Sequence, residues 1–100
     1  MEDLSVQQLK EKLENKEDFI LIDVRETYEH DEFNIGGKLV PLGDLMTALP
    51  DLQDSKEKEI VVYCRSGNRS GMAKQLLNGM GFTKVRNTLG GILAWQEAGL

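Results

Sequence analysis

The centre of the chain reads IVVYCRSGNRSG over residues 60–71, an apolar run followed at once by small, polar and basic residues. A short continuous run of β-branched residues is typical of a strand that is buried on both faces of a parallel sheet. Apolar side chains then recur at helical spacing over residues 72–77. The stretch therefore predicts a strand over 60–63, a loop over 64–71 and a helix after it.

Similar signals alternate on both sides of this stretch. Apolar runs bounded by turn residues predict three further strands, and apolar residues at helical spacing predict four further helices. The strands are expected over 19–22, 39–41 and 84–89, and the helices over 5–15, 27–33, 43–49 and from Gly90-Gly91 onward. Strands that alternate with helices imply parallel pairing through right-handed crossovers. We therefore expect one three-layer α/β domain over residues 1–100.

Three helix boundaries carry specific signals. Ser5 and Gln8 have the spacing of a capping box at the start of the first helix. Thr27 is expected to cap the acidic helix that follows the first strand. Pro50 is expected to close the helix over 43–49, because proline lacks the N–H that a helix interior needs.

The composition is that of an ordinary globular domain, with 40% apolar and 29% charged residues in a chain of 100. No apolar run approaches the roughly 20 residues that span a bilayer, so we expect no membrane segment. The amino terminus, MEDLSVQQ, carries two acids and no base, unlike a basic leader. A cytoplasmic location is the corresponding expectation.

A single cysteine and a single histidine exclude a disulfide framework and a Cys/His zinc cluster. We expect neither a metal nor a cofactor. A net charge of −5 argues against nucleic acid as a partner. The charge is uneven, however: residues 1–59 hold 16 acidic and 7 basic side chains, whereas residues 60–100 hold 1 acidic and 5 basic ones. Cys64 therefore lies in the basic part of the chain.

Cys64 stands where the central strand turns toward a helix, and Asp23 and Arg25 follow the strand over 19–22 in the same way. Ligands of parallel sheets bind at the carboxyl ends of the strands. Loop N–H groups and a helix N-terminus favour an anion there, and neighbouring arginines lower a thiol pKa from about 8.5. A buried structural cysteine would not be followed by such polar residues, so Cys64 is predicted to be a nucleophile. The predicted anion cradle is Arg65, Ser66, Gly67, Asn68, Arg69 and Ser70.

Three segments occur together in one order: LIDVRE over 21–26, CRSGNRS over 64–70, and LGGILAW over 89–95, with Gly99 beyond them. In this the chain resembles the single-domain rhodaneses, a family of sulfurtransferases. The resemblance implies a five-stranded, mostly parallel sheet flanked by helices on both faces. It implies a cysteine that accepts a sulfane sulfur as a persulfide and passes it to a thiophilic acceptor. It also implies that Gly90-Gly91 and Trp95 are scaffold.

The resemblance implies partners of matching chemistry. The donor would be a small anion such as thiosulfate, or a protein persulfide in a sulfur relay, and the acceptor would be a thiol.

The chain departs from the family over residues 34–38, where NIGGK replaces the common His-Ile-Pro-Gly-Ala. Asn34 can donate and accept hydrogen bonds, so we interpret it as a structural replacement. His30 is expected on the solvated surface of the acidic helix, as is the acidic run over 26–32.

Two other functions remain open from the sequence. Cysteine phosphatases also attack an anion from such a loop, but their loops place five residues between cysteine and arginine, whereas four separate Cys64 from Arg69. A phosphatase also needs an acid for its leaving group, while sulfite leaves thiosulfate without a proton. The third possibility is a redox-sensing or interaction module without activity.

Asp23 and Arg25 are expected to join neighbouring loops by an ion pair and to support the site without touching the substrate.

Overall fold

The computed structural model describes residues 1–100, and a four-stranded parallel sheet forms its centre. The strands are β1 (Ile20–Asp23), β2 (Lys38–Leu39), β3 (Ile60–Tyr63) and β4 (Val85–Asn87), in the order β2-β1-β3-β4. The helices are α1 (Val6–Glu14), α2 (Thr27–Glu32), α3 (Leu45–Leu52), α4 (Asn68–Gly79) and α5 (Gly91–Glu97). None of these helices combines the length and the apolar composition needed to cross a bilayer.

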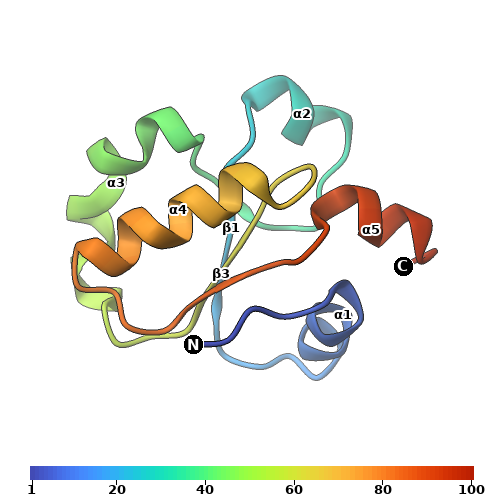
Figure 1. The fold of residues 1–100 in the computed structure, drawn as a ribbon, viewed down its shortest axis with the longest axis horizontal. Coiled ribbons are helices and arrows are strands. Elements are labelled where there is room, and N and C mark those ends of the chain that lie inside the picture. Colours follow the sequence, from blue (N-terminus) through green and yellow to red (C-terminus); the bar gives the residue numbers. More distant parts are fainter.

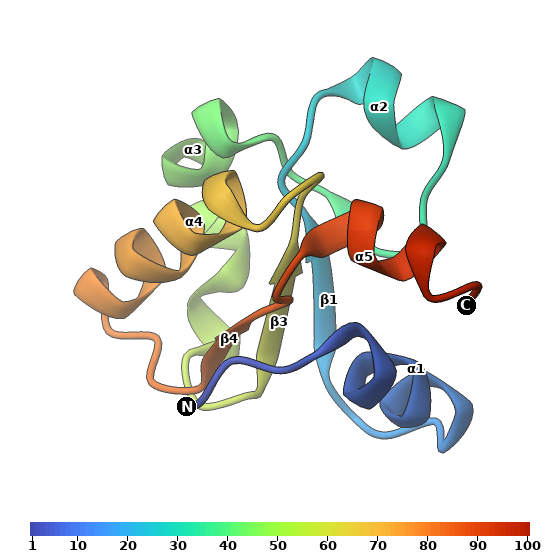
Figure 2. The same cartoon turned by 45° about the vertical axis from the view of Figure 1, so that its right-hand side comes forward.

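The helices form a layer on each face of the sheet, with α1 and α5 on one side and α3 and α4 on the other (Figures 1 and 2). The side chains of β3 alternate between the two layers, as the pleat requires. Val61 packs in the cluster that contains Trp95, and Val62 packs in the larger cluster with Leu77. The expected three-layer α/β arrangement is confirmed, and every strand pair is parallel. Helix α2 stands beyond the carboxyl end of β1 (Figure 2).

The expected five-stranded sheet is wrong, because the segment before α1 contributes only an isolated bridge between Leu4 and Thr88. Leu4 donates its N–H to Asn87 O at 3.1 Å and accepts from Leu89 N at 2.9 Å. Pairing stops there because the next residue, Ser5, is already the N-cap of α1. The capping box that the sequence predicts at Ser5 and Gln8 is confirmed, and it ends the extended segment after Leu4.

Helix α4 begins at Asn68, so four residues expected in the loop, Asn68 to Gly71, form its first turn instead. Gly67 makes this early start possible because it adopts a positive φ of 102°, which L side chains rarely adopt. The prediction that Pro50 ends the third helix is also wrong. Helix α3 continues to Leu52, since Leu49 and Leu52 both bury their side chains in the core.

The expected cap of α2 is displaced by one residue. Thr27 is the first helical residue, and Glu26 is the cap. The backbone N–H of Glu26 donates to Oε1 of Glu29 at 3.0 Å, so a carboxylate within the first turn satisfies this N–H group.

The segment over 34–38 has its own backbone shape. Gly36 has φ of +93°, whereas proline fixes φ at about −65°, so the proline common in the family cannot occupy this position. Asn34 Nδ2 donates to His30 O at 3.0 Å, and its Oδ1 accepts from Gly36 N at 2.9 Å. Asn34 therefore serves the structural purpose expected of it. Gly37 is required because a Cβ there would lie 2.6 Å from the Tyr63 ring.

Candidate active site

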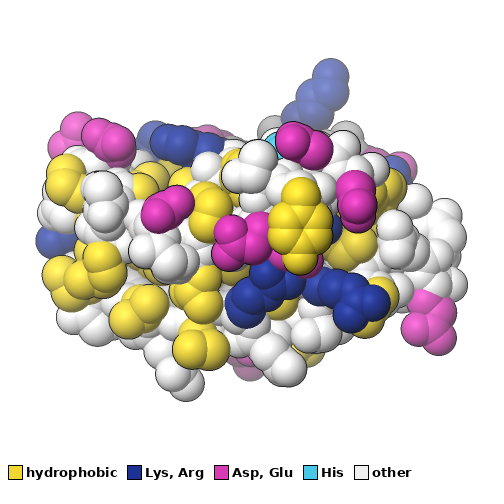
Figure 3. Space-filling model, turned by 90° about the horizontal axis from the view of Figure 1, so that it is seen from above, with side chains coloured by type: hydrophobic (Ala, Val, Ile, Leu, Met, Phe, Trp, Pro, Cys, Tyr) yellow, Lys and Arg dark blue, Asp and Glu magenta, His cyan; other side chains and the backbone are white.

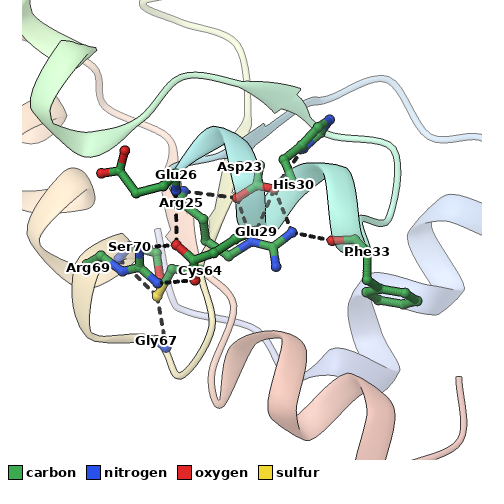
Figure 4. Close-up of polar contacts among 10 residues, drawn as sticks. All are labelled: Asp23, Arg25, Glu26, Glu29, His30, Phe33, Cys64, Gly67, Arg69 and Ser70. Carbon is green, nitrogen blue, oxygen red and sulfur yellow. Dashed lines mark hydrogen bonds and ion pairs between the residues drawn. The ribbon is translucent and has the colours of Figure 1, made fainter.

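Cys64 follows the last residue of β3 and is 1% exposed. Its Sγ accepts hydrogen bonds from Gly67 N at 3.1 Å and from Ser70 N at 3.4 Å (Figure 4). The hydroxyl of Ser70 lies 3.3 Å from the same sulfur. The turn at Gly67 and the first turn of α4 thus direct backbone N–H groups at one sulfur atom, which is an arrangement suited to negative charge.

The pKa of the Cys64 thiol lies below its ordinary value. Burial raises this pKa, but the hydrogen bonds of the cradle, including those from the amides of Ser70, Gly67 and Ser66, together outweigh burial. The sequence predicts this lower thiol pKa but attributes it partly to the flanking arginines. In the structure, the hydrogen bonds of the cradle lower the pKa more than the arginines do.

The Gly-Gly segment places the start of α5 directly against the thiol loop. Ile92 N donates to Cys64 O at 2.9 Å, and Leu93 N donates to Arg65 O at 3.0 Å. A Cβ on Gly91 would lie 2.6 Å from Arg65 O and closer still to Cys64 O. Glycine at this position therefore allows α5 to hold the carbonyl groups of the loop while the loop amides face the sulfur.

The sequence predicts that Arg69 binds the anion, which would leave its guanidinium free to face the site. In the structure, Arg69 instead forms a bidentate ion pair with Glu29 of α2. The two bonds measure 2.6 and 2.8 Å (Figure 4). The Arg69 guanidinium lowers the pKa of Glu29 to about 2. The expectation that the acidic run over 26–32 is solvated is therefore wrong for Glu29, whose side chain is 12% exposed. We missed this carboxylate at the site.

A cleft of about 590 Å³ lies beside the thiol loop, between α2 and α5. Its charged lining residues are Arg25, Glu29, Glu32, Arg65 and Arg69. On this face, basic and acidic side chains lie next to one another (Figure 3). Arg65 is exposed and takes part in none of the ion pairs, so it is the uncompensated cation of the cleft. Ser66 and Asn68 are also exposed, and their side chains do not line the cleft.

Asp23 and Arg25 form a buried ion pair at the carboxyl end of β1. Arg25 Nη2 lies 2.8 Å from Asp23 Oδ2 and also donates to Phe33 O at 2.6 Å, which ties β1 to the end of α2. His30 Nδ1 lies 2.9 Å from the same Asp23 oxygen (Figure 4). The expectation of a surface position for His30 is therefore wrong. Burial raises the pKa of Asp23, but the bonds from Arg25 and His30 lower it overall.

Asn87, at the end of β4, is a second residue that we missed. Its Nδ2 donates to Gly67 O at 3.1 Å, and its Oδ1 accepts from Ser70 Oγ at 2.5 Å. The rule that strands end at a common ligand-binding edge, which led us to Asp23 and Cys64, would have led to Asn87 as well.

Comparison with known proteins relates this site to a family. The model of the rhodanese-like domain matches residues 5–98. A sulfurtransferase from Allochromatium vinosum is 33% identical over 104 residues, covering 98% of this chain and 91% of that protein. YrkF of Bacillus subtilis is 33% identical over 94 residues, covering 93% of this chain, but the chain spans only 50% of that relative. The human single-domain sulfurtransferase TSTD1 superimposes with a TM-score of 0.83 at 29% identity, with 95% of each chain covered.

Proposed function

This chain belongs to the rhodanese-like domain family, and we propose that residues 1–100 form one sulfurtransferase domain whose nucleophile is Cys64. The observation that carries the proposal is a single thiol in a cradle of N–H donors. The one histidine of the chain is engaged with Asp23, so the site offers the sulfur charge stabilisation and no imidazole base. Such a site suits a reaction in which the leaving group departs without a proton.

The first step would be attack by the Cys64 thiolate on the outer sulfur of thiosulfate. A bond forms between Sγ and that sulfur, the S–S bond of thiosulfate breaks, and its electron pair leaves with sulfite. The products are a Cys64 persulfide anion and sulfite, so charge and atoms balance. A thiophilic acceptor such as cyanide or a thiolate then attacks the outer sulfur, and the electron pair returns to Sγ as thiolate. No redox partner is needed for either step.

Two features of the site favour a small anionic donor with a terminal sulfur. Cys64 is 1% exposed, so the reacting sulfur must be an end atom that can enter the cradle. Arg65 is the one arginine of the neighbouring cleft that forms no ion pair, and such a charge attracts an anion. Thiosulfate meets both conditions. A protein persulfide also presents a terminal sulfur, and it is the alternative donor within the same chemistry.

Cysteine phosphatase activity is the competing enzymatic function. The chain places four residues between Cys64 and Arg69, one fewer than a phosphatase loop. Moreover, the Arg69 guanidinium is held by Glu29, whereas a phosphatase would need its arginine for the phosphoryl oxygens. Both observations support sulfur transfer over phosphate hydrolysis.

One paired assay separates the candidates. Thiocyanate formation from thiosulfate and cyanide is measured beside hydrolysis of an aryl phosphate, each with the unmodified protein and with Cys64→Ser. Sulfur transfer that is lost in Cys64→Ser, with equal and minimal phosphate hydrolysis by both proteins, supports the proposal. Cysteine-dependent phosphate hydrolysis would replace it with the phosphatase. Inactivity in both assays, with every persulfide donor tried, would leave the redox-sensing or interaction module.

A further inference from the structure

The hydroxyl of Ser70 lies between two acceptors but has only one proton. Ser70 Oγ is 3.3 Å from Cys64 Sγ and 2.5 Å from Asn87 Oδ1. Ser70 is fully buried and Asn87 is 7% exposed, so water is not a ready substitute for either partner. At any moment the hydroxyl can donate its proton either to the sulfur or to the amide oxygen, and the shorter contact is to the amide oxygen.

The orientation of the Asn87 side chain is fixed by a bond on its other side. Its Nδ2 donates to Gly67 O at 3.1 Å, and this leaves Oδ1 directed at Ser70. The Asn87 backbone N–H donates to Asp3 Oδ1 at 2.9 Å, which anchors the residue itself. An amide oxygen has no hydrogen to give, so the Ser70 hydroxyl must be the donor in the 2.5 Å contact.

We infer that Asn87 is a positioning residue that holds the Ser70 proton away from Cys64. The sulfur then faces the lone pair of the Ser70 oxygen and takes its stabilisation from the loop amides. In the thiol form, the S–H group donates to Ser70 Oγ, and Ser70 donates to Asn87. In the thiolate form, the loop amides, those of Gly67 and Ser70 among them, donate to the sulfur, and the Ser70 hydroxyl does not.

This arrangement limits how far the cradle stabilises the thiolate. A thiolate that receives fewer hydrogen bonds keeps a higher pKa and a greater intrinsic nucleophilicity, because nucleophilicity falls as pKa falls. The benefit for attack on a donor sulfur rests on the proposed sulfur transfer. The direction of the Ser70 proton does not, because it follows from the contacts of Ser70 and Asn87 alone.

Asn87 also supports Gly67, so a loss of activity on substitution would not identify its role. A double-substitution cycle does. The four proteins are the unmodified chain, Ser70→Ala, Asn87→Leu and the double variant, and the thiol pKa of each is taken from the pH dependence of alkylation by iodoacetamide. Loosening of Gly67 changes this pKa equally with and without Ser70, whereas release of the Ser70 proton requires Ser70 to be present.

With Asn87 in place, Ser70→Ala should leave the thiol pKa unchanged or lower it slightly, because the proton it removes does not reach the sulfur and the S–H group loses only a weak acceptor. With Asn87→Leu, the released hydroxyl donates to the thiolate, and Ser70→Ala should then raise the pKa by about one unit. An equal rise in both backgrounds, or no effect of Ser70→Ala in either, would overturn the inference.

A second measurement keeps the inference testable if Asn87→Leu does not fold. The side-chain carbonyl carbon of Asn87, labelled with ¹³C, is followed by NMR through the titration of Cys64 in the unmodified protein and in Ser70→Ala. If Asn87 keeps the proton, the shift responds only to the new charge, and the titration-induced change is the same in both proteins. A larger change in the unmodified protein would show that the proton moves to the sulfur, and the inference would be wrong. Both readouts are independent of sulfur transfer, so a failed sulfurtransferase assay would leave them interpretable.

Discussion

Glu29 of α2 binds both terminal nitrogens of Arg69 in the first turn of α4, although 40 residues separate the two along the chain. This pair joins the helix beyond β1 to the helix that carries the thiol cradle. It also neutralises one of the two arginines next to Cys64, so Arg65 is the cation left to draw in an anion.

The pair gives the protein a pH-dependent stability. The pKa of Glu29 is lowered from 4.5 to about 2. The ion pair therefore contributes fully to the free energy of unfolding above pH 4.5, and this contribution disappears as the pH falls toward 2. Glu29→Gln should reduce the free energy of unfolding by about 1 kcal/mol at neutral pH, since the pair is partly exposed. Urea unfolding of both proteins at a series of pH values measures this. The gap should narrow below pH 4.5; a gap that is constant with pH would show that the ion pair is not its source.

Removal of Arg69 should impair thiosulfate use mainly through Glu29. Arg69→Ala leaves a carboxylate without its partner in the lining of the cleft, where it repels the donor, and kcat/KM for thiosulfate should fall about tenfold. Adding Glu29→Gln should restore much of this loss. Arg65→Ala should also lower kcat/KM, and the kcat/KM of this variant should depend less on salt than that of the unmodified protein. Adding Glu29→Gln to Arg65→Ala should not restore kcat/KM, because the charge of Arg65 is still missing. Failure of Glu29→Gln to improve Arg69→Ala would assign the loss to direct contact between Arg69 and the donor.

The buried carboxylate of Asp23 depends more on Arg25 than on His30. Arg25 makes three side-chain bonds to this carboxylate, and His30 makes one. Arg25→Ala leaves a buried charge poorly compensated and should cost about 3 kcal/mol or more. His30→Ala removes one hydrogen bond and should cost about 1 kcal/mol. Chemical denaturation of the two variants checks the ranking, and equal losses would contradict the arrangement of bonds around Asp23.

Gly91 should tolerate no side chain. A Cβ would meet the carbonyl of Arg65 at 2.6 Å, and the backbone φ of +56° adds strain, so Gly91→Ala should cost about 2–4 kcal/mol. Gly79 is the matched control, because its added Cβ would meet nothing within 4 Å and its φ is not positive. Gly79→Ala should leave stability unchanged or raise it by up to about 1 kcal/mol. Thermal unfolding that ranks the two variants equally would be inconsistent with the contact between α5 and the thiol loop.

The features that local sequence determines could be predicted well. The strand, loop and helix around Cys64 and the capping box at Ser5 depend on neighbouring residues, and both occur in the structure. That local cap also explains the error in strand number, because it ends the pairing that Leu4 begins. Residues 68–71 were harder to assign, since small and polar residues suit a loop and a first helical turn equally well.

The contacts that shape the candidate site could not be predicted in the same way. The bonds from Glu29 to Arg69 and from Ser70 to Asn87 join segments that only the folded sheet brings together. An acidic helix read alone is indistinguishable from a solvated one, because the partner that buries its carboxylate lies on another element. His30 and Asp23 are only seven residues apart, yet their contact depends on how α2 turns back over the end of β1.

The central claim is that Cys64 carries the transferred sulfur, and intact-protein mass spectrometry after incubation with thiosulfate tests it most directly. The unmodified protein should gain the mass of one sulfur atom, and cyanide or dithiothreitol should remove it. Cys64→Ser should gain nothing, while Arg25→Ala, if folded, should still be loaded, because Arg25 supports the site without carrying sulfur. No gain in mass with thiosulfate or any other persulfide donor, or an equal gain in Cys64→Ser, would contradict the account.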